Sequence, residues 1–176
     1  ADGLGFEKAL DHHGSMLQIS PDGKRMRVFA SGFRAPNGMG MGPKDQITTS
    51  DNEGTWVAAT PINWVREGGF HGVMGMAHGL DDSKRDGLLC WIPHGVDNSG
   101  GAQVWVPKGW WGDYSGELLH ISYGKAQMFH VLKEEIDGTM QGGVTPLAVD
   151  GSFDTGIIRG RFRQQDKAYY VGGLKG

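Results

Sequence analysis

The sequence predicts an all-β, β-propeller-like fold of about three to four antiparallel blades in a single domain, residues 1–176. Glycine is abundant, with 31 residues in a chain that is 38% hydrophobic, which suits many tight turns. No window holds apolar residues at helical spacing for three turns. Short apolar runs instead recur between turn-forming residues, as in repeated hairpins.

Short runs of apolar and β-branched residues predict the strands. In chain order these runs cover residues 15–20, 25–30, 46–50, 62–65, 88–92, 103–106, 117–122, 127–132, 144–149, 157–162 and 168–172. The turn sequences "SPDGK" (20–24) and "SYGK" (122–125) predict two hairpins. The nearest approach to a helix is "VLKEEIDG" (131–138), which predicts at most one helical turn.

A weak internal repeat supports a propeller. Residues 38–42 and 156–160 share the spacing Gly-x-x-x-Gly, and each follows one of the two predicted hairpins. The stretch 30–54 is therefore interpreted as a turn, the strand 46–50 and a second turn. Closed propellers usually have about four to eight blades, so the ring is small or incomplete, or the chain is part of a larger propeller.

Composition argues against several classes of function. A net charge of −3 gives no bulk attraction to nucleic acid or to anionic membranes. No apolar run reaches the roughly 20 residues of a membrane-spanning helix. The single Cys90 excludes an intrachain disulfide, and its setting "LLCWI" predicts a buried thiol. Fingerprints of α/β-hydrolases, phosphate loops and dinucleotide-binding folds are absent.

Two runs carry a family resemblance. The run "SPDGKRMRVFASGFRAPNGMGMGPKDQITTSDNEG" resembles the blade signature of the soluble quinoprotein glucose and sorbosone dehydrogenase superfamily, in which a hairpin precedes "GxRNPxG", a strand and a Gly- or Asx-rich turn. The run from 88 to 176 resembles exported, sorbosone-dehydrogenase-like propeller proteins of bacteria. The resemblance implies a propeller fold and a periplasmic or extracellular location. For enzymes of the superfamily it implies pyrroloquinoline quinone (PQQ) over the central channel, with calcium, a histidine base and several arginines.

Individual residues follow from this resemblance. Arg34 matches the arginine of "GxRNPxG" that contacts the quinone in the family, whereas Ala35 replaces the family's asparagine. Asn37 of the same segment is a further candidate cofactor-binding residue. Arg159 and Arg161 are candidates on their own pattern, with a solvated or partner-facing stripe as the alternative. The calcium-binding turn corresponds to Asp51, Asn52 and Glu53, whose oxygen atoms suit calcium but would equally serve a solvated turn.

No motif assigns the catalytic histidine. His12 and His13 lie beside Asp11, which could orient an imidazole, so they are the candidate catalytic bases. The alternative is that both have a role only in a loop or an interface. On an extended chain they would point to opposite faces. His120 and His130, on the two arms of the second hairpin, could meet across it as a two-histidine metal pair.

Three further features could carry a site. Arg159, Arg161 and Arg163 alternate, so they share one face that meets solvent, an acidic group or an anionic ligand. The Asx-rich turn "VDNSGG" (96–101) could hold a cation or simply close a turn. Trp110 and Trp111 either fill a gap between blades or form an exposed pair that binds a partner.

Two hypotheses result. The preferred one is a non-catalytic, exported accessory or structural subunit, without cofactor, that binds other proteins in a larger complex, for example a membrane-associated electron-transfer complex. The alternative is a PQQ-dependent sugar dehydrogenase of the glucose or sorbosone type, or a fragment of one, with PQQ and calcium. The first is preferred because about three blades and Ala35 do not readily supply side chains that converge from around a closed ring.

Overall fold

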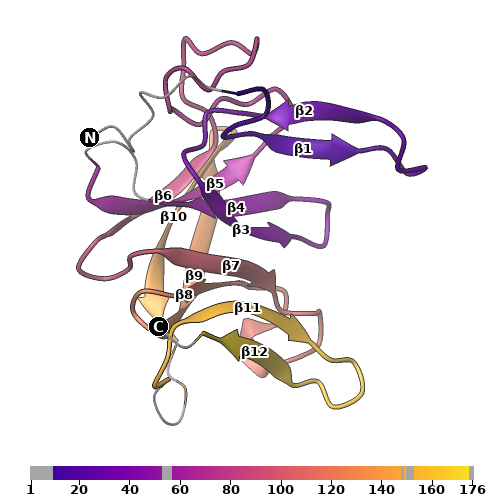
Figure 1. Cartoon of the computed structure of the whole chain (residues 1–176). Helices are drawn as coiled ribbons and strands as arrows, with labels where there is room; N and C mark the ends of the chain where they lie inside the picture. The colour runs from indigo at the N-terminus through magenta and orange to yellow at the C-terminus, as the bar shows by residue number, and fades with distance from the viewer. Residues whose placement is uncertain (1–9, 53–56, 148, 150–152, 175–176) are drawn as a thin grey trace.

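The chain folds into antiparallel sheets arranged as part of a propeller (Figure 1). The computed structural model describes residues 10–52, 57–147, 149 and 153–174. This part of the chain contains twelve strands in four sheets and one 3-10 turn, η2 (Gly112–Tyr114), but no α-helix. The predicted all-β, propeller-like class with an incomplete ring is confirmed. Within the same residues, no helix has the length and apolarity needed to cross a membrane.

Two sheets have four strands each, and every strand pairs with the next one along the chain. The first sheet consists of β3 (Pro36–Met41), β4 (Ile47–Asp51), β5 (Ala59–Val65) and β6 (Leu88–Pro93). The second consists of β7 (Gly100–Trp105), β8 (Leu118–Ser122), β9 (Gln127–Ile136) and β10 (Thr139–Pro146). Each sheet is therefore a simple meander, as a propeller blade requires.

Two further sheets have two strands each. They are formed by β1 (Met16–Ile19) with β2 (Met26–Ala30), and by β11 (Ile157–Phe162) with β12 (Tyr169–Gly173). Both predicted hairpins, β1–β2 and β8–β9, are present. In the first, the carboxylate of Asp22 accepts the N–H of Lys24 at 3.1 Å, which closes the Pro-Asp-Gly turn.

The first strands of successive sheets lie side by side. β3 contacts β7, and β7 contacts β11, so these strands form the inner side of an arc (Figure 1). The last strand of one sheet leads into the first strand of the next, as β6 leads to β7 and β10 to β11. Because β2 leads into β3 in the same way, β1–β2 takes the place of the two outer strands of a preceding blade.

This arrangement corrects the predicted repeat in one respect. The two Gly-x-x-x-Gly segments are equivalent, since β3 and β11 are both first strands. The hairpins assigned to them are not equivalent, because β1–β2 corresponds to β9–β10 and not to β8–β9. The predicted repeat was out of step by one strand in its second copy, because turn residues mark every hairpin of a meander alike.

Two local predictions are also wrong. Residues 36–41 were predicted as part of a turn, yet they form the innermost strand β3, whose glycines allow a close approach of the backbone to β7. Residues 131–138 are not a helical turn. They form the end of β9 and its turn, where Asp137 and Gly138 have φ of 49° and 76°. An Asp-Gly pair with two positive φ angles is typical of a tight hairpin.

The core lies between the sheets. Ile62, Leu89 and Ile92 of the first four-stranded sheet pack against Leu118 and Val131 of the second. A second cluster packs the other face of β8 and β9 against β11, and a smaller one packs β2 against β5. Cys90 belongs to the first cluster, so the predicted buried thiol is confirmed, and burial raises its pKa to about 12.

We predict that Gly38→Ala destabilises the fold. A methyl group on Gly38 would collide with the backbone of Gly101 and Ala102 on β7, and overpacking of this kind costs about 1–3 kcal/mol. The matched control is Gly143→Ala in β10, because a Cβ there would meet no atom within 4 Å. Urea denaturation should show the loss for Gly38→Ala only, and equal stability of the two variants would contradict the close contact between β3 and β7.

Candidate functional site

A cleft of about 350 Å³ lies on the inner side of the arc. Residues of β3, β7 and β11, which are the first strands of three sheets, line it. Residues at the start of β1 and Thr49 of β4 complete the lining. Its lining consists of Ser15, Met16, Leu17, Pro36, Asn37, Gly38, Met39, Thr49, Ala102, Arg159 and Arg161. We call it the central cleft, since the inner strands of a propeller surround its axis.

Three predicted cofactor residues meet in the central cleft. Arg159 and Arg161 alternate on β11, opposite Gly172 and Tyr170 of β12, and both side chains are exposed. Arg159 donates to the side-chain oxygen of Asn37 on β3 at 3.3 Å, which connects two strands far apart in sequence. Within the described chain, neither guanidinium has a carboxylate at ion-pair distance. The lining is therefore cationic and able to receive an anion.

Arg163 does not share this environment. Its guanidinium donates to the carboxylate of Asp166 at 3.0 Å and approaches the ring of Tyr170. The prediction that all three arginines share one face of a strand holds at most for Arg159 and Arg161, because Arg163 lies beyond the end of β11 and forms an ion pair in the hairpin loop.

Arg34 is not part of the cleft lining. Its backbone N–H and that of Ala35 donate to the two carboxylate oxygens of Asp51, at 2.7 and 2.6 Å. Desolvation raises the pKa of Asp51, and these hydrogen bonds oppose the rise without cancelling it. The buried carboxylate of Asp51 therefore anchors the segment that leads into β3.

The proposed calcium turn is only partly described. Asp51 uses both oxygens on backbone N–H groups, and Asn52 follows it at the end of β4, whereas Glu53 lies outside the described residues. Over residues 10–52, 57–147, 149 and 153–174, no group of three or more His, Cys, Asp and Glu side chains could hold a metal ion. Calcium binding by Asp51, Asn52 and Glu53 stays a prediction.

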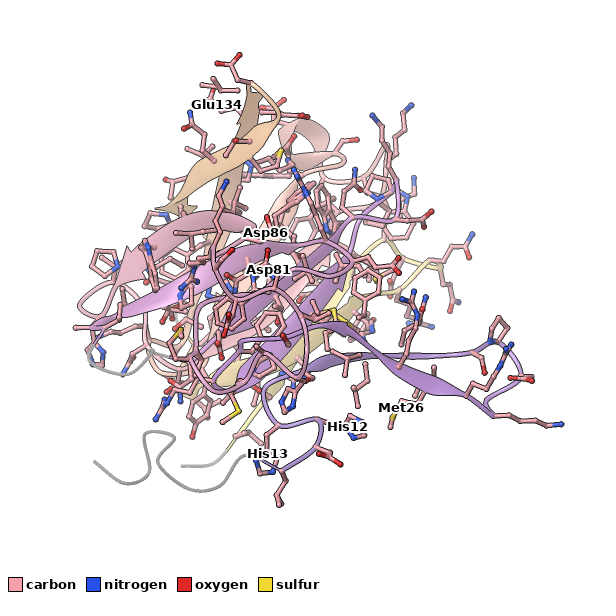
Figure 2. All side chains as sticks on the ribbon, turned by 90° about the horizontal axis from the view of Figure 1, so that it is seen from above. His12, His13, Met26, Asp81, Asp86 and Glu134 are labelled. Carbon is pink, nitrogen blue, oxygen red and sulfur yellow. The ribbon has the colours of Figure 1, made fainter. Side chains whose placement is uncertain are left out.

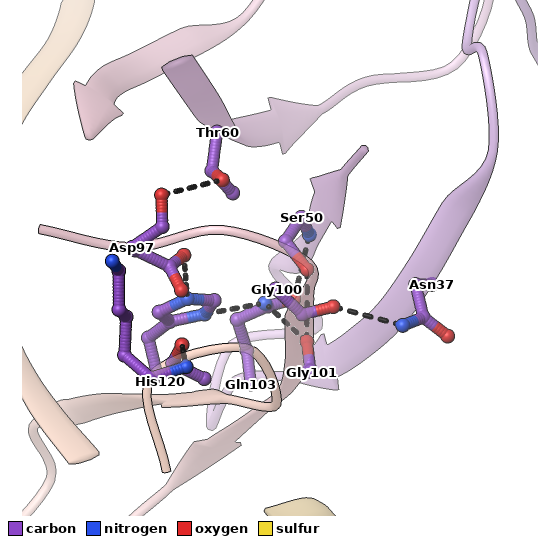
Figure 3. Close-up of polar contacts among 10 residues, drawn as sticks. Asn37, Ser50, Thr60, Asp97, Gly100, Gly101, Gln103 and His120 are labelled. Atoms are coloured by element: carbon purple, nitrogen blue, oxygen red, sulfur yellow. Dashed lines mark hydrogen bonds and ion pairs between the residues drawn. The ribbon is translucent and has the colours of Figure 1, made fainter. Parts of the chain in front are cut away.

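A buried polar network joins the two four-stranded sheets (Figure 3). The N–H of Ser50 donates to the side-chain oxygen of Gln103 at 2.9 Å, so the Gln103 amide nitrogen donates to Nδ1 of His120 at 3.0 Å. His120 Nε2 then donates to Asp97 at 2.8 Å, and both of these side chains are completely buried. The order of donors makes His120 the neutral Nε2–H tautomer and Asp97 its acceptor.

This network explains the turn at 96–101. Burial alone raises the pKa of Asp97, but hydrogen bonds from His120, Ser122 and Thr60 outweigh it, and the pKa is lowered. Asp97 thus lies inside the protein rather than in a solvated loop, where it holds the connection between β6 and β7. The Asx-rich turn has a structural role that its composition did not reveal.

The expected meeting of His120 with His130 is wrong. His120 pairs with Phe129 and Leu119 pairs with His130 in the register of β8 and β9, so the two imidazoles point to opposite faces of the sheet. His130 lies 3.4 Å from the carboxylate of Glu117 and packs against the ring of Tyr114.

His12 and His13 lie outside the central cleft. Figure 2 shows both on the turn that precedes β1, and both are exposed. The premise of an extended chain is wrong, because residues 11–14 form a turn and His12 has a φ of 73°. The backbone oxygen of His13 contacts the ring of His78 at 2.5 Å. Their role as a base stays a prediction without support from this placement.

Trp110 and Trp111 pack between sheets. Both rings meet Phe162 of β11 edge-on, with centroids 5.9 and 4.9 Å away, and Trp111 also meets Tyr169. Trp111 is 37% exposed and donates its indole N–H to the carbonyl of Lys167. The geometry matches the gap-filling alternative, and binding of a partner by this pair stays a prediction.

Sequence reasoning missed a buried cluster at His71. The imidazole stacks on Phe33 at 4.4 Å, and neither ring nitrogen has a hydrogen-bond partner within the described chain. Nearby Arg85 donates to Asn63 at 3.1 Å and lies over the ring of Trp91. Desolvation, with a smaller effect of the Arg85 charge, lowers the pKa of His71 to about 4. The residues of this cluster come from segments far apart in the sequence, so no local motif predicted it.

Comparisons with known proteins identify the fold. No protein-family model matches the sequence, and neither does any curated protein. A putative glucose dehydrogenase from Thermus thermophilus matches 90% of this chain and 48% of its own, with a TM-score of 0.64 and 19% identity. The PQQ-bound aldose sugar dehydrogenase of Streptomyces coelicolor matches 91% and 46%, with a TM-score of 0.60 and 13% identity.

The soluble aldose sugar dehydrogenase of Escherichia coli, in its apo form, matches 90% of this chain and 50% of its own, with a TM-score of 0.61 and 12% identity. This chain therefore spans about half the length of the solved structures that it matches. The resemblance noted in the sequence is confirmed at the level of the fold.

We predict that His71 makes stability depend on pH between about 4 and 6.5. A histidine has a pKa of about 6.5 when unfolded, so the folded state, with its pKa near 4, holds His71 neutral where the unfolded chain is protonated. This contribution is complete above pH 6.5 and is lost as the pH falls to 4, by about 3 kcal/mol.

The measurement is the urea midpoint as a function of pH. His71→Phe should flatten the slope between pH 4 and 6.5, whatever its effect on absolute stability. The same substitution at the exposed His12 is the control and should keep the slope. A wild-type midpoint that does not fall over this range would contradict a buried, neutral His71.

Proposed function

We propose that this chain supplies the cofactor-binding wall of a PQQ-dependent sugar dehydrogenase, with the quinone in the central cleft. The observation that carries the proposal is the pair Arg159 and Arg161 on the innermost strand β11, facing a cleft of about 350 Å³ without a described carboxylate partner. The fold likeness to a PQQ-bound aldose sugar dehydrogenase supports the same cofactor.

The residues of the central cleft fit an anionic quinone. PQQ is a planar quinone that carries carboxylates, and the guanidinium fork binds a carboxylate through two parallel hydrogen bonds. Asn37 holds Arg159 from across the cleft, while its amide nitrogen donates to the carbonyl of Gly100 at 2.9 Å. Met16 and Met39 provide apolar lining for a flat ring. The donor set and the apolar walls thus suit the two parts of the cofactor.

The division of labour follows from what the lining contains. When bound, the quinone would supply the acceptor for the hydride of a sugar alcohol or hemiacetal. Arg159 and Arg161 would bind and orient its carboxylates. The described lining contains no His, Asp or Glu, so the base that takes the proton from the sugar would come from other residues.

The second candidate is the non-catalytic accessory subunit. The absence of an acid or base from the described cleft lining favours it, together with Ala35 at the position of the family's asparagine. An exported location, protein partners and a place in an electron-transfer complex belong to this proposal. It differs from the first in one measurable respect, since it requires no affinity for the quinone.

We predict that the chain binds PQQ and that Arg159→Ala or Arg161→Ala weakens binding about 10- to 100-fold. A hydrogen bond to a charged group contributes about 1.5–3 kcal/mol, which corresponds to this range. Titration calorimetry or quenching of tryptophan fluorescence measures the affinity without requiring turnover.

Arg163→Ala is the matched control, because Arg163 carries the same charge on the same hairpin but pairs with Asp166 outside the cleft. It should keep the wild-type affinity. Equal loss in all three variants would mean that binding depends only on total charge. No affinity for PQQ in the wild-type chain would overturn the proposal and leave the accessory subunit.

A further inference from the structure

Both two-stranded sheets have an unpaired edge. Within the described chain, β1 pairs only with β2, and β12 pairs only with β11. The N–H and C=O groups along such an edge form a template for another strand. The two sheets correspond to different halves of a blade. β11 and β12 take the place of the two inner strands, whereas β1 and β2 take the place of the two outer strands.

The β1–β2 hairpin carries an apolar face. Met16 faces the first four-stranded sheet, where it packs near Ala30 and Val65. The alternate positions Leu17 and Ile19 point to the other side, where Leu17 also borders the central cleft, together with Met26, which pairs with Ile19. Ile19 and Met26 are 55% and 48% exposed. No described residue covers this face, which we call the hairpin face.

The polar side of the same hairpin is already in use. Arg27 donates to the side-chain oxygen of Gln18 at 2.6 Å and forms an ion pair with Glu67, which follows β5. The hairpin therefore has one side fixed to its own chain, and the apolar hairpin face is directed away from it.

A complementary surface lies on β9 and β10. Met128 of β9 packs toward β11. The alternate residues of β9, which are His130, Leu132 and Glu134, lie on the same face of the sheet as Met128. Leu132 is 50% exposed and lines an open pocket with a volume of about 780 Å³. The lining includes the acidic residues Asp113, Glu117 and Glu134, together with Lys133, which pairs with Glu117. We call this surface the acceptor face.

One chain cannot bring these two surfaces together. Figure 2 shows Met26 of the hairpin and Glu134 of the acceptor face at opposite ends of the molecule. The acceptor face includes Asp113, two residues after Trp111, whose ring meets Tyr169 of β12. β12 lies at the far end of the arc from β1 (Figure 1).

We propose that two copies of this chain close one ring, in which β12 of each copy pairs with β1 of the other. The sheet β11–β12–β1–β2 would then have four strands in the order of the two complete sheets, from inner to outer. The hairpin face of one copy would cover the acceptor face of the other. The exposed basic residues Lys24 and Arg25 at the hairpin turn suit the carboxylates of Asp113 and Glu134, which have no described cationic partner.

The strand count supports closure. Twelve described strands correspond to about three blades of four, so two copies give about six, within the range of closed propellers. A twofold axis through the ring makes the two contacts identical and pairs the edges of β1 and β12 in both copies. The proposal does not depend on the binding of a quinone.

The first test is the mass of the purified 176-residue chain in solution. Size-exclusion chromatography with light scattering, over a range of micromolar concentrations, should give twice the 19.0 kDa of one chain. A monomer at all concentrations would overturn the proposal. So would open-ended polymers, because they would show that the head-to-tail contact does not close.

Substitutions then locate the contact. Ile19→Lys on the hairpin face and Leu132→Lys on the acceptor face should each give monomers, although the two residues lie far apart in one chain. Both positions are exposed, so circular dichroism should stay unchanged. Val96→Lys is the control, since Val96 is 42% exposed in the turn between β6 and β7, away from both surfaces.

Mixing distinguishes this contact from a hairpin-to-hairpin dimer. An equimolar mixture of the Ile19→Lys and Leu132→Lys chains should recover dimers, because one of the two contacts in the mixed pair has wild-type residues on both sides. A dimer that Leu132→Lys leaves intact, or a mixture that stays monomeric, would contradict the head-to-tail ring.

Discussion

The close approach of β3 to β7 is the contact on which the rest of the structure depends. Gly38 leaves no room for a side chain against Gly101, so the two innermost strands pack backbone to backbone. This spacing fixes the distance between the two four-stranded sheets, and with it the depth of the apolar cluster between β5, β6, β8 and β9. It also sets Asn37 within reach of Arg159, so the geometry of the central cleft follows from the same contact.

The buried network of Ser50, Gln103, His120 and Asp97 specifies how the sheets meet. Burying a carboxylate is costly unless it is hydrogen-bonded, and breaking a buried pair leaves an uncompensated group. Any sliding of one sheet along the other would separate Ser50 from Gln103, whose amide also holds His120 against Asp97. Apolar packing supplies the attraction between the sheets, and this network selects a single arrangement of them.

The sequence was informative where structure is local. Strand runs and turn residues predicted the all-β class and the hairpins at Asp22 and Gly124, because period-2 patterns and turn chemistry are local signals. β3 was missed because its glycines look like turn residues, and the Asp137-Gly138 turn was a signal that went unused. The pairing of Arg159 with Asn37 joins residues 122 positions apart, which no local pattern reveals. The buried setting of His71 was invisible for the same reason.

The strictly sequential pairing of the strands has a consequence for how the chain folds. Every ladder in the described chain joins neighbours in sequence, from β1–β2 to β11–β12, so each sheet can grow by hairpin steps. Most of these steps close short loops, and the longest connection, residues 66–87 between β5 and β6, adds only a modest entropy cost. Hairpins of this kind form in about 1–10 μs. The association of the sheets is the non-local event, since it must align β3 with β7 and dehydrate Asp97 and His120 at once. Sheet-by-sheet folding followed by slower docking is the order of events that this topology favours.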